Sequence, residues 1–208
     1  RERRIMFRIR TFLLPVTISL ALAAALTLSG CARTVIGAGA AAGTAAMEER
    51  GISGVADDTA IRLRLNALYS DDDERLWRKI GFQVYGGRVL LTGMLDTPEM
   101  QSRAIRLAWQ ADGVTEVINE IEVVKSDGIS GYSRDTLITT QLKAKLLFDK
   151  NVSSINYSID AVRGKVYLIG IAQSRQELDR VINHARSIDY VQKVVSYVRI
   201  KRTTGDPS

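Results

Sequence analysis

An internal repeat limits what this chain can fold into more than any other feature of its sequence. Residues 58–117 match residues 135–194 at a constant offset of 77 positions, with no gap between them. The matched residues include the Asp-Thr pair at the start of each copy and the glycines and apolar residues of its centre. In the centre, Gly87, Val89, Leu91 and Gly93 recur as Gly164, Val166, Leu168 and Gly170. The chain therefore contains one small domain twice.

Each copy shows the pattern of a helix, two strands, a second helix and a third strand. The first helix is expected to begin at Asp58 in copy one and at Asp135 in copy two, because aspartate is a good N-cap. Alternating apolar residues around Gly86–Gly87 and around Arg163–Gly164 predict two β-hairpins, with glycine supplying the positive φ of the turn. Second helices are expected over residues 97–111 and 174–188, and third strands over residues 117–123 and 194–200.

These elements predict an α+β fold of two tandem domains, each in the order α-β-β-α-β. A hairpin pairs its strands antiparallel and a strand–helix–strand connection pairs them parallel, so a small mixed three-stranded sheet with both helices on one face is expected. Copy one would span residues 57–124 and copy two residues 134–202, with residues 125–133 as a linker and residues 203–208 as a tail. Because a unit of about 70 residues is barely stable alone, the copies are expected to pack together.

The first 30 residues have the composition of a secretory signal peptide. Residues 11–28 carry no charge, follow Arg8 and Arg10, and end in the small-residue sequence Leu28-Ser29-Gly30-Cys31. An uncleaved membrane helix is the alternative, since 18 such residues just reach spanning length. Leu-Ser-Gly-Cys resembles a bacterial lipobox, which implies cleavage before Cys31 and acyl chains on that cysteine. Two or three acyl chains hold a protein durably at a membrane.

Residues 31–56 are rich in Gly and Ala and lack a helical or strand period, so they are expected to form a tether. The segment Gly37–Ala42 matches a permissive dinucleotide-binding pattern, but that pattern needs a preceding strand, and a lipidated cysteine lies six residues upstream. Cys31 is the only cysteine in the sequence. No disulfide, cysteine-based metal site or thiol nucleophile is therefore expected, and no cofactor beyond the covalent lipid.

Charge is distributed unevenly between the copies. The chain has a net charge of +6, but five arginines and one glutamate lie in the signal and the remainder carries only +2, which argues against a nucleic-acid partner. Residues 57–124 have a net charge of −4 and residues 134–202 a net charge of +7. The basic copy suits an anionic phospholipid membrane. Two alternatives are a solvated basic face and complementary packing of the acidic copy on the basic copy.

The combined pattern resembles the BON domain. Each copy has Asp-Thr, a short amphipathic helix, a strand, the sequence Gly-Lys/Arg-Val-x-Leu-x-Gly, a helix and a closing Val-x-x-Val strand, and the most specific stretch is Asp135–Leu147. Two copies behind a lipobox resemble dual-BON outer-membrane lipoproteins. This implies a lipid-anchored protein on the periplasmic face of the outer membrane, and Ala32 in place of Asp agrees with that location.

The same resemblance implies binding of anionic phospholipid through the first helix of the second domain, support of envelope integrity, and no catalysis. In this chain, Ile138, Leu142 and Leu146 of that helix form a core stripe at about 100° per residue. The other side carries apolar residues flanked by lysines, which suits a helix lying in a head-group layer. The predicted phospholipid-binding residues are Leu137, Thr140, Lys143, Ala144, Leu147 and Phe148.

Two further features bear on this prediction, a departure from the family at Leu137 and a contrast with copy one that supports it. In the lipoprotein family that this chain resembles, a Trp can stand at the position where this chain has Leu137. Copy one has Ser70 and Asp71 at the positions of Leu147 and Phe148, as a solvent-exposed helix would. Burial of the outer side of the helix against copy one is the alternative.

No catalytic or metal site is expected. Asp71–Glu74 lacks the glycine and the distant glutamate of a calcium loop and is interpreted as a solvated loop. His184, the only histidine, is expected in the core or at its edge without partners for a triad. Trp77 and Trp109 are interpreted as packing residues. The alternative function is a non-catalytic periplasmic adaptor that docks on an outer-membrane assembly protein or another envelope protein through the acidic copy or the sheet edges.

Overall fold

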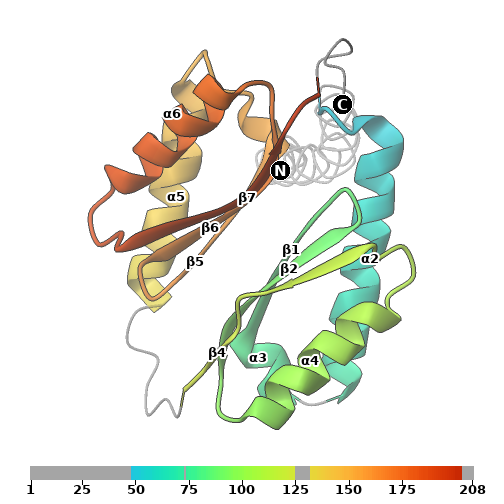
Figure 1. The fold of residues 1–208 in the computed structure, drawn as a ribbon. Helices are drawn as coiled ribbons and strands as arrows, with labels where there is room; N and C mark the ends of the chain where they lie inside the picture. The colour runs from blue at the N-terminus through green and yellow to red at the C-terminus, as the bar shows by residue number, and fades with distance from the viewer. Residues whose placement is uncertain (1–47, 73, 125–131, 203–208) are drawn as a thin grey trace, which may run out of the picture. The chain divides into compact units, whose positions relative to one another are not determined.

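The computed structural model describes residues 48–72, 74–124 and 132–202 (Figure 1). These described residues belong to one compact unit. The predictions for the signal peptide (residues 1–30), for Cys31, for residues 32–47 of the tether, for residues 125–131 of the linker and for the tail lie outside the described residues.

Copy one begins with the long helix α2 (Gly51–Asp72) and the short helix α3 (Glu74–Lys79). The hairpin of β1 (Ile80–Tyr85) and β2 (Arg88–Leu95) follows, then α4 (Pro98–Gln110) and the short strands β3 (Glu116–Asn119) and β4 (Glu122–Val123). Figure 1 shows α2 and α4 on the same face of this sheet.

Copy two begins with α5 (Tyr132–Phe148) and the single 3-10 turn η1 (Ser154–Asn156). The hairpin of β5 (Tyr157–Val162) and β6 (Lys165–Ala172) follows, then α6 (Arg175–Arg186) and β7 (Lys193–Ile200). Helices α5 and α6 lie on the same face of the sheet in Figure 1. The predicted order α-β-β-α-β is therefore confirmed in both copies, with α3 as an addition in copy one.

Both sheets are mixed, as the sequence predicts. The hairpins β1–β2 and β5–β6 are antiparallel, and the pairs β2–β3 and β6–β7 are parallel. The two parallel strand pairs have the same register. Val89 pairs with Val117 in copy one, and the equivalent Val166 pairs with Val194 in copy two. The strand after the second helix therefore lies beside the second hairpin strand in each copy.

The predicted third strand of copy one is divided into β3 and β4. The side-chain oxygen of Asn119 accepts a hydrogen bond from the backbone N–H of Ile121 (3.2 Å), and Gln101 of α4 donates to the Ile121 carbonyl (2.7 Å). These bonds replace ladder bonds at the break. Copy two has Leu178 at the position of Gln101, and β7 pairs with β6 without a break as far as Ile200.

Each copy has a core between its helices and its sheet. The core stripe predicted for α5 is confirmed, because Ile138, Leu142 and Leu146 are almost completely buried. They pack in one cluster with Val166 and Leu168 of β6 and with residues of α6. The equivalent positions of copy one contribute Ile61, Leu65, Tyr69, Val89 and Leu91 to a second cluster.

The second helices begin where the sequence predicts. The hydroxyl of Thr97 accepts a hydrogen bond from the N–H of Met100 (3.2 Å), and Pro98 stands at the first helical position of α4. In copy two the hydroxyl of Ser174 accepts from the N–H of Glu177 (3.1 Å). Local sequence is sufficient to place the start of both second helices.

The prediction that Asp58 and Asp135 are N-caps is wrong. Helix α2 begins at Gly51 and α5 begins at Tyr132, so both aspartates lie within a helix. Asp58 is almost completely buried. An aspartate near a helix start has the same appearance in the sequence whether its carboxylate bonds the first turn of its own helix or a distant segment.

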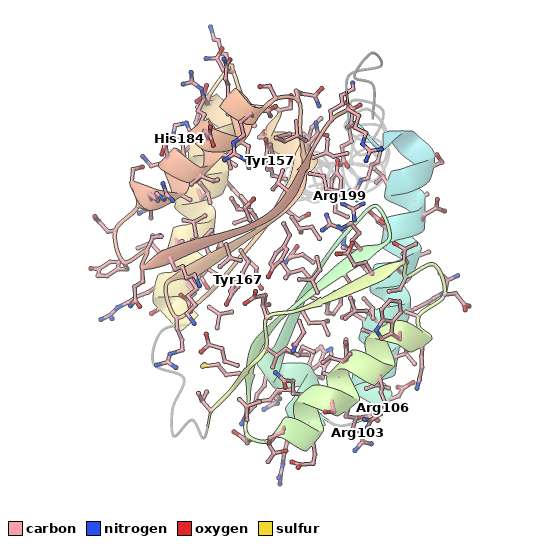
Figure 2. The ribbon with its side chains drawn as sticks, viewed as in Figure 1. Arg103, Arg106, Tyr157, Tyr167, His184 and Arg199 are labelled. Carbon is pink, nitrogen blue, oxygen red and sulfur yellow. The ribbon has the colours of Figure 1, made fainter. Side chains whose placement is uncertain are left out.

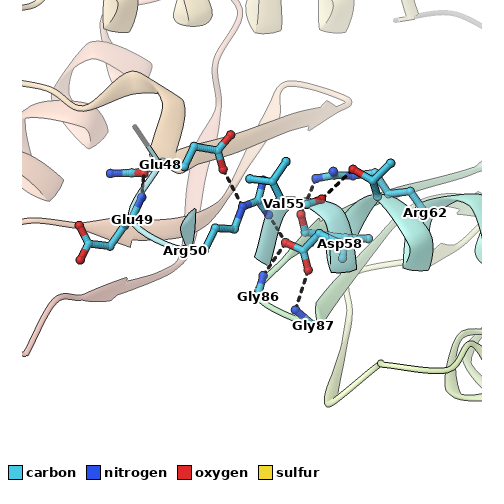
Figure 3. A network of polar contacts seen from close by, with 11 residues as sticks. Glu48, Glu49, Arg50, Val55, Asp58, Arg62, Gly86 and Gly87 are labelled. Carbon is cyan, nitrogen blue, oxygen red and sulfur yellow. Dashed lines mark hydrogen bonds and ion pairs between the residues drawn. The ribbon is translucent and has the colours of Figure 1, made fainter. Parts of the chain in front are cut away.

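The two aspartates instead tie the first helix of each copy to the hairpin turn. The Asp58 carboxylate accepts hydrogen bonds from the backbone N–H groups of Gly86 (2.7 Å) and Gly87 (2.8 Å), as Figure 3 shows. The positive φ at both turn residues leaves these N–H groups outside the strand ladder. In copy two, Asp135 accepts in the same way from Arg163 (2.8 Å) and Gly164 (2.9 Å).

We expect Asp135→Asn to lower the free energy of unfolding by about 1.5–3 kcal/mol, the range for hydrogen bonds to a charged group. The amide has one oxygen, so one of the two turn N–H groups would face the NH₂ group and lose its acceptor. Urea denaturation measures the loss. The control is Asp179→Asn, which removes only an exposed ion pair with Arg175 (3.2 Å) and should change stability by about 0.5 kcal/mol or less. Equal stability of the two variants would contradict this role of Asp135.

Residues 48–56 belong to the folded unit, so the predicted tether is too long at its C-terminal end. Residues 51–56 are helical. The Arg50 guanidinium pairs with Glu48 (2.6 Å) and with Asp58, as Figure 3 shows. It also lies 4.5 Å above the Tyr85 ring. These tertiary contacts hold the start of the helix in a stretch whose own helix propensity is weak.

The predicted solvated loop over residues 71–74 is also corrected. Helix α2 continues through Asp72, and α3 begins at Glu74. The Asp72 carboxylate pairs with Arg103 of α4 (2.6 Å), which connects the end of α2 to the neighbouring helix. The acidic run does not reveal this tertiary ion pair at the end of the helix.

The sheet face opposite the helices forms a third apolar cluster, and this cluster contains residues of both copies. Figure 2 shows Tyr167 on the side of its sheet away from α5 and α6. Because side chains alternate along a strand, residues between the core positions of β2 and β6 point to this second face. The cluster consists of Tyr85, Leu90, Ile118, Tyr167 and Ile169. The prediction that the copies pack together is confirmed.

Polar contacts at the edge of this cluster join acids of copy one to bases of copy two. Arg199 pairs with Glu116 (2.8 Å), and Lys165 pairs with Glu122. Arg88 also bonds Glu116 (2.8 Å) and holds the pKa of that carboxyl below its usual value. Complementary packing, the alternative explanation of the charge difference, therefore accounts for part of it.

Candidate functional site

The outer side of α5 is exposed. Leu147 is 68% exposed, Phe148 is 81% exposed and Leu137 is 46% exposed, whereas Leu142 on the opposite side is fully buried. The alternative that this side is buried against copy one is therefore contradicted. Three large apolar side chains on one helix surface are the kind of feature that indicates contact with a partner or a membrane.

The remaining predicted lipid-binding residues lie on the same surface. Thr140, Lys143 and Ala144 are all exposed. The Thr140 hydroxyl donates to the backbone carbonyl of Thr136 (2.8 Å), so its hydrogen is already satisfied within the helix. Ala144 lies between Leu137 and Phe148 along the helix, because positions four and seven residues apart share one side. All six predicted residues are brought together on one face, and their contact with lipid remains a prediction.

Three lysines surround the apolar residues at the C-terminal end of α5. Lys143, Lys145 and Lys150 are exposed and form no ion pair within residues 48–72, 74–124 and 132–202. By contrast, three other bases of copy two pair with acids of copy one. Those three are Arg163, Lys165 and Arg199. Lys143, Lys145 and Lys150 are therefore free to meet an external anion beside Leu147 and Phe148.

A shallow hollow of about 660 Å³ lies beside this end of α5. Lys145, Phe148, Lys150 and His184 are among the residues that line it. The ring Nε2 of His184, labelled in Figure 2, lies 2.7 Å from the carboxylate of Asp149. This hydrogen bond holds the pKa of Asp149 below its usual value. The contact also fixes the end of α5 to α6.

Sequence reasoning places His184 near the core edge, and its half-buried position agrees. The sequence does not predict Lys150 as part of the site, and it does not predict the hollow. A possible signal was the run from Lys143 to Lys150, which has three lysines in eight residues. The pairing of Asp149 with His184 crosses between two helices and has no sequence signal.

The equivalent helix face of copy one differs. Ser70 and Asp71 are exposed where copy two has Leu147 and Phe148. Leu63 is the only exposed large hydrophobic residue on the described part of α2, with 66% exposure, and it aligns with Thr140. The fold is shared, so this contrast isolates what is specific to copy two.

The interpretation of Trp77 and Trp109 as packing residues is corrected. Trp77 on α3 is 46% exposed and Trp109 on α4 is 53% exposed. Both tryptophans lie in copy one, and their exposure gives this copy a partly apolar surface of its own.

Within the described residues, no group of three or more His, Cys, Asp or Glu side chains could hold a metal ion. In the same residues, no helix combines the length and the apolar composition needed to cross a bilayer. The exposed face of α5 is the candidate site because of its exposed apolar residues and lysines, and its chemistry is that of a surface with apolar and cationic groups.

Sequence relatives cover most of the chain. An uncharacterized protein of Anaplasma centrale is 40% identical over 148 residues, which are 71% of this chain and 97% of that protein. Outer membrane lipoprotein DolP of Haemophilus influenzae is 31% identical over 180 residues, 86% of this chain and 92% of that protein. Osmotically-inducible protein Y of Escherichia coli K12 is 30% identical over 147 residues, 70% of this chain and 73% of that protein.

The family model for the BON domain matches the chain twice, over residues 57–125 and 134–202. These are the two segments that fold as copies of one mixed sheet with its helices. The chain belongs to the BON-domain family and carries two BON domains in tandem.

Proposed function

We propose that this chain is a lipid-anchored protein of the periplasmic face of the outer membrane, that it binds anionic phospholipid through the outer face of α5, and that it thereby helps to maintain envelope integrity. The observation that carries the proposal is the exposed combination of Leu147 and Phe148 with the unpaired Lys143, Lys145 and Lys150. The relationship to an outer membrane lipoprotein supports its location in the envelope. No catalysis is part of this function.

The physical basis is two weak attractions that act together. A lysine near an anionic membrane surface contributes about 1 kcal/mol, so three lysines contribute about 3 kcal/mol. Leu147 and Phe148 add the transfer of apolar surface from water to the boundary of head groups and acyl chains. The lysine stems reach outward while their ammonium groups stay among the phosphates.

A lipid anchor makes this modest affinity sufficient. Acyl chains on Cys31 would hold the folded unit near the bilayer, so that contact of α5 with the surface becomes an intramolecular step. Residues 32–47 would then be the tether, since residues 48–50 already contact the folded unit. The acyl chains would keep the protein at the membrane, and α5 would set its orientation there.

A second candidate function is a non-catalytic adaptor that docks on another envelope protein. The half-exposed Trp77 and Trp109 of copy one favour it, because exposed aromatic residues are common at protein interfaces. The acidic residues Glu116 and Glu122 do not favour it, since they already pair with copy two. The two candidates differ in their behaviour toward pure lipid vesicles. A lipid-binding protein binds vesicles that contain no other protein, whereas an adaptor does not.

We expect Leu147→Asp and Phe148→Asp each to weaken binding to phosphatidylglycerol vesicles by about tenfold or more, since each places a carboxylate in the head-group layer. Because both side chains are exposed, the free energy of unfolding should change by about 0.5 kcal/mol or less. Lys143→Glu should weaken binding as well, and rising salt should weaken it in the wild type. Co-sedimentation of residues 32–208 with vesicles measures binding, and urea denaturation measures stability.

The matched control is Leu63→Asp in copy one, at a site as exposed as Leu147 on the equivalent helix. It should leave vesicle binding unchanged. Equal binding of wild type to phosphatidylcholine vesicles, or undiminished binding by the Leu147, Phe148 and Lys143 variants, would refute the proposed anionic-lipid site on α5. A wild type that binds neither kind of vesicle would favour the adaptor.

The anchor is tested separately with Cys31→Ala. Without the thiol no thioether to diacylglycerol can form, so we expect the variant to lose metabolic labelling with palmitate and to appear in the soluble fraction after carbonate washing. Continued labelling, or a wild type that does not incorporate palmitate, would contradict the proposed lipobox.

A further inference from the structure

The two copies have equivalent cavities where the first helix, the hairpin turn and the loop before the last strand meet. The cavity of copy one has a volume of about 500 Å³ and that of copy two about 450 Å³. Both lie beside the aspartate that holds the hairpin turn, Asp58 or Asp135. Such volumes are within the range of small-molecule sites.

The charge lining these cavities is reversed between the copies. In copy one the lining includes three carboxylates and one cation: Asp57, Asp58, Asp112 and Arg64. In copy two it includes three cations and two carboxylates: Arg134, Arg163, Lys165, Asp135 and Glu122. The repeat offset places Arg134 at the position of Asp57 and Arg163 at the position of Gly86. Copy two has therefore acquired cations in a cavity that the shared fold provides.

Backbone strain occurs in the same cavity. Among the described residues, only Arg163 (φ 51°) and Tyr190 (φ 70°) have positive φ without being glycine, and both line the cavity of copy two. Copy one has glycine at both equivalent positions, Gly86 and Gly113, also with positive φ. The left-handed conformation is unfavourable for side chains other than glycine, and bulky residues in it are rare.

Packing within the fold does not account for the tyrosine. Tyr190 is 59% exposed, so burial does not offset its strain. Its ring lies 5.2 Å from the Arg134 guanidinium, which is an exposed cation–π contact of modest strength. Strained residues that are not justified by packing are found at ligand-binding sites.

We propose that this cavity binds a small ligand that carries a phosphate group. Two arginines and one lysine from two separate segments, the start of α5 and the hairpin between β5 and β6, converge on it, and guanidinium groups pair well with phosphate oxygens. The Tyr190 ring provides a face for the rest of the ligand. Glu122 shows that the cavity accepts an oxyanion, because its carboxylate already pairs with Lys165 and lies 3.6 Å from Arg163. The ligand competes with Glu122 and adds a contact to Arg134.

This site is separate from the proposed function, since it lies at the N-terminal end of α5, whereas Leu147 and Phe148 lie at the C-terminal end. The phosphate can belong to a free phosphate ester or to a lipid head group. Variants at the two ends of α5 therefore distinguish failure of one proposal from failure of the other.

The test is calorimetric titration of residues 32–208 with glycerol 3-phosphate, together with co-sedimentation on phosphatidylglycerol vesicles. We expect saturable binding of one glycerol 3-phosphate per chain. Tyr190→Gly and Arg163→Gly, which restore the residues of copy one, should each weaken it by about tenfold or more. Their melting temperature should be unchanged or higher, because glycine relieves the strained backbone. Glu122→Gln should strengthen binding by removing the competing carboxylate.

Phe148→Asp and Arg186→Ala are the controls, and both should leave glycerol 3-phosphate binding unchanged. A free phosphate ester is the ligand if Tyr190→Gly affects only calorimetry, and a lipid head group is the ligand if it also weakens vesicle binding. The proposal is overturned if the wild type shows no saturable binding, or if Tyr190→Gly lowers the melting temperature while binding is retained.

Discussion

The contact between the two helix-free sheet faces is the constraint on which the rest of the structure depends. Each copy covers one face of its sheet with its own helices, and the other face carries large side chains such as Leu90 and Tyr167. A unit of about 70 residues cannot leave such a face in water without loss of stability. Each copy therefore completes the other, which gives a physical reason for the duplication to persist.

This contact also determines which surfaces are free. It pairs Glu116 and Glu122 of copy one with bases of copy two, so neither copy presents its full formal charge to solvent. The helices lie on the outer side of each sheet as a consequence, and the two first helices have diverged there. Copy one has kept a mostly polar surface on α2, whereas copy two combines Leu147 and Phe148 with lysines on α5.

The sequence predicts the features that depend on local pattern. The hairpins, the starts of the second helices near Thr97 and Ser174 and the core stripe of α5 follow from turn chemistry and periodicity. The exposure of Leu147 and Phe148 follows from the same helical period. Contacts between distant segments could not be predicted in this way, because sequence spacing carries no information about them. The turn-binding role of Asp135, the helix start held by Arg50 and the cavity beside Tyr190 are of this kind.

The central claim is that the C-terminal end of α5 enters a layer of anionic head groups, and the emission of a single tryptophan at residue 148 tests it most directly. The variant Phe148→Trp is prepared with Trp77→Phe and Trp109→Phe, both at partly exposed sites, so that one indole reports. Our account predicts a blue shift of emission with phosphatidylglycerol vesicles and none with phosphatidylcholine vesicles, because the indole leaves water only where lysines attract the surface. Emission unchanged by either vesicle, or shifted equally by both, would contradict it.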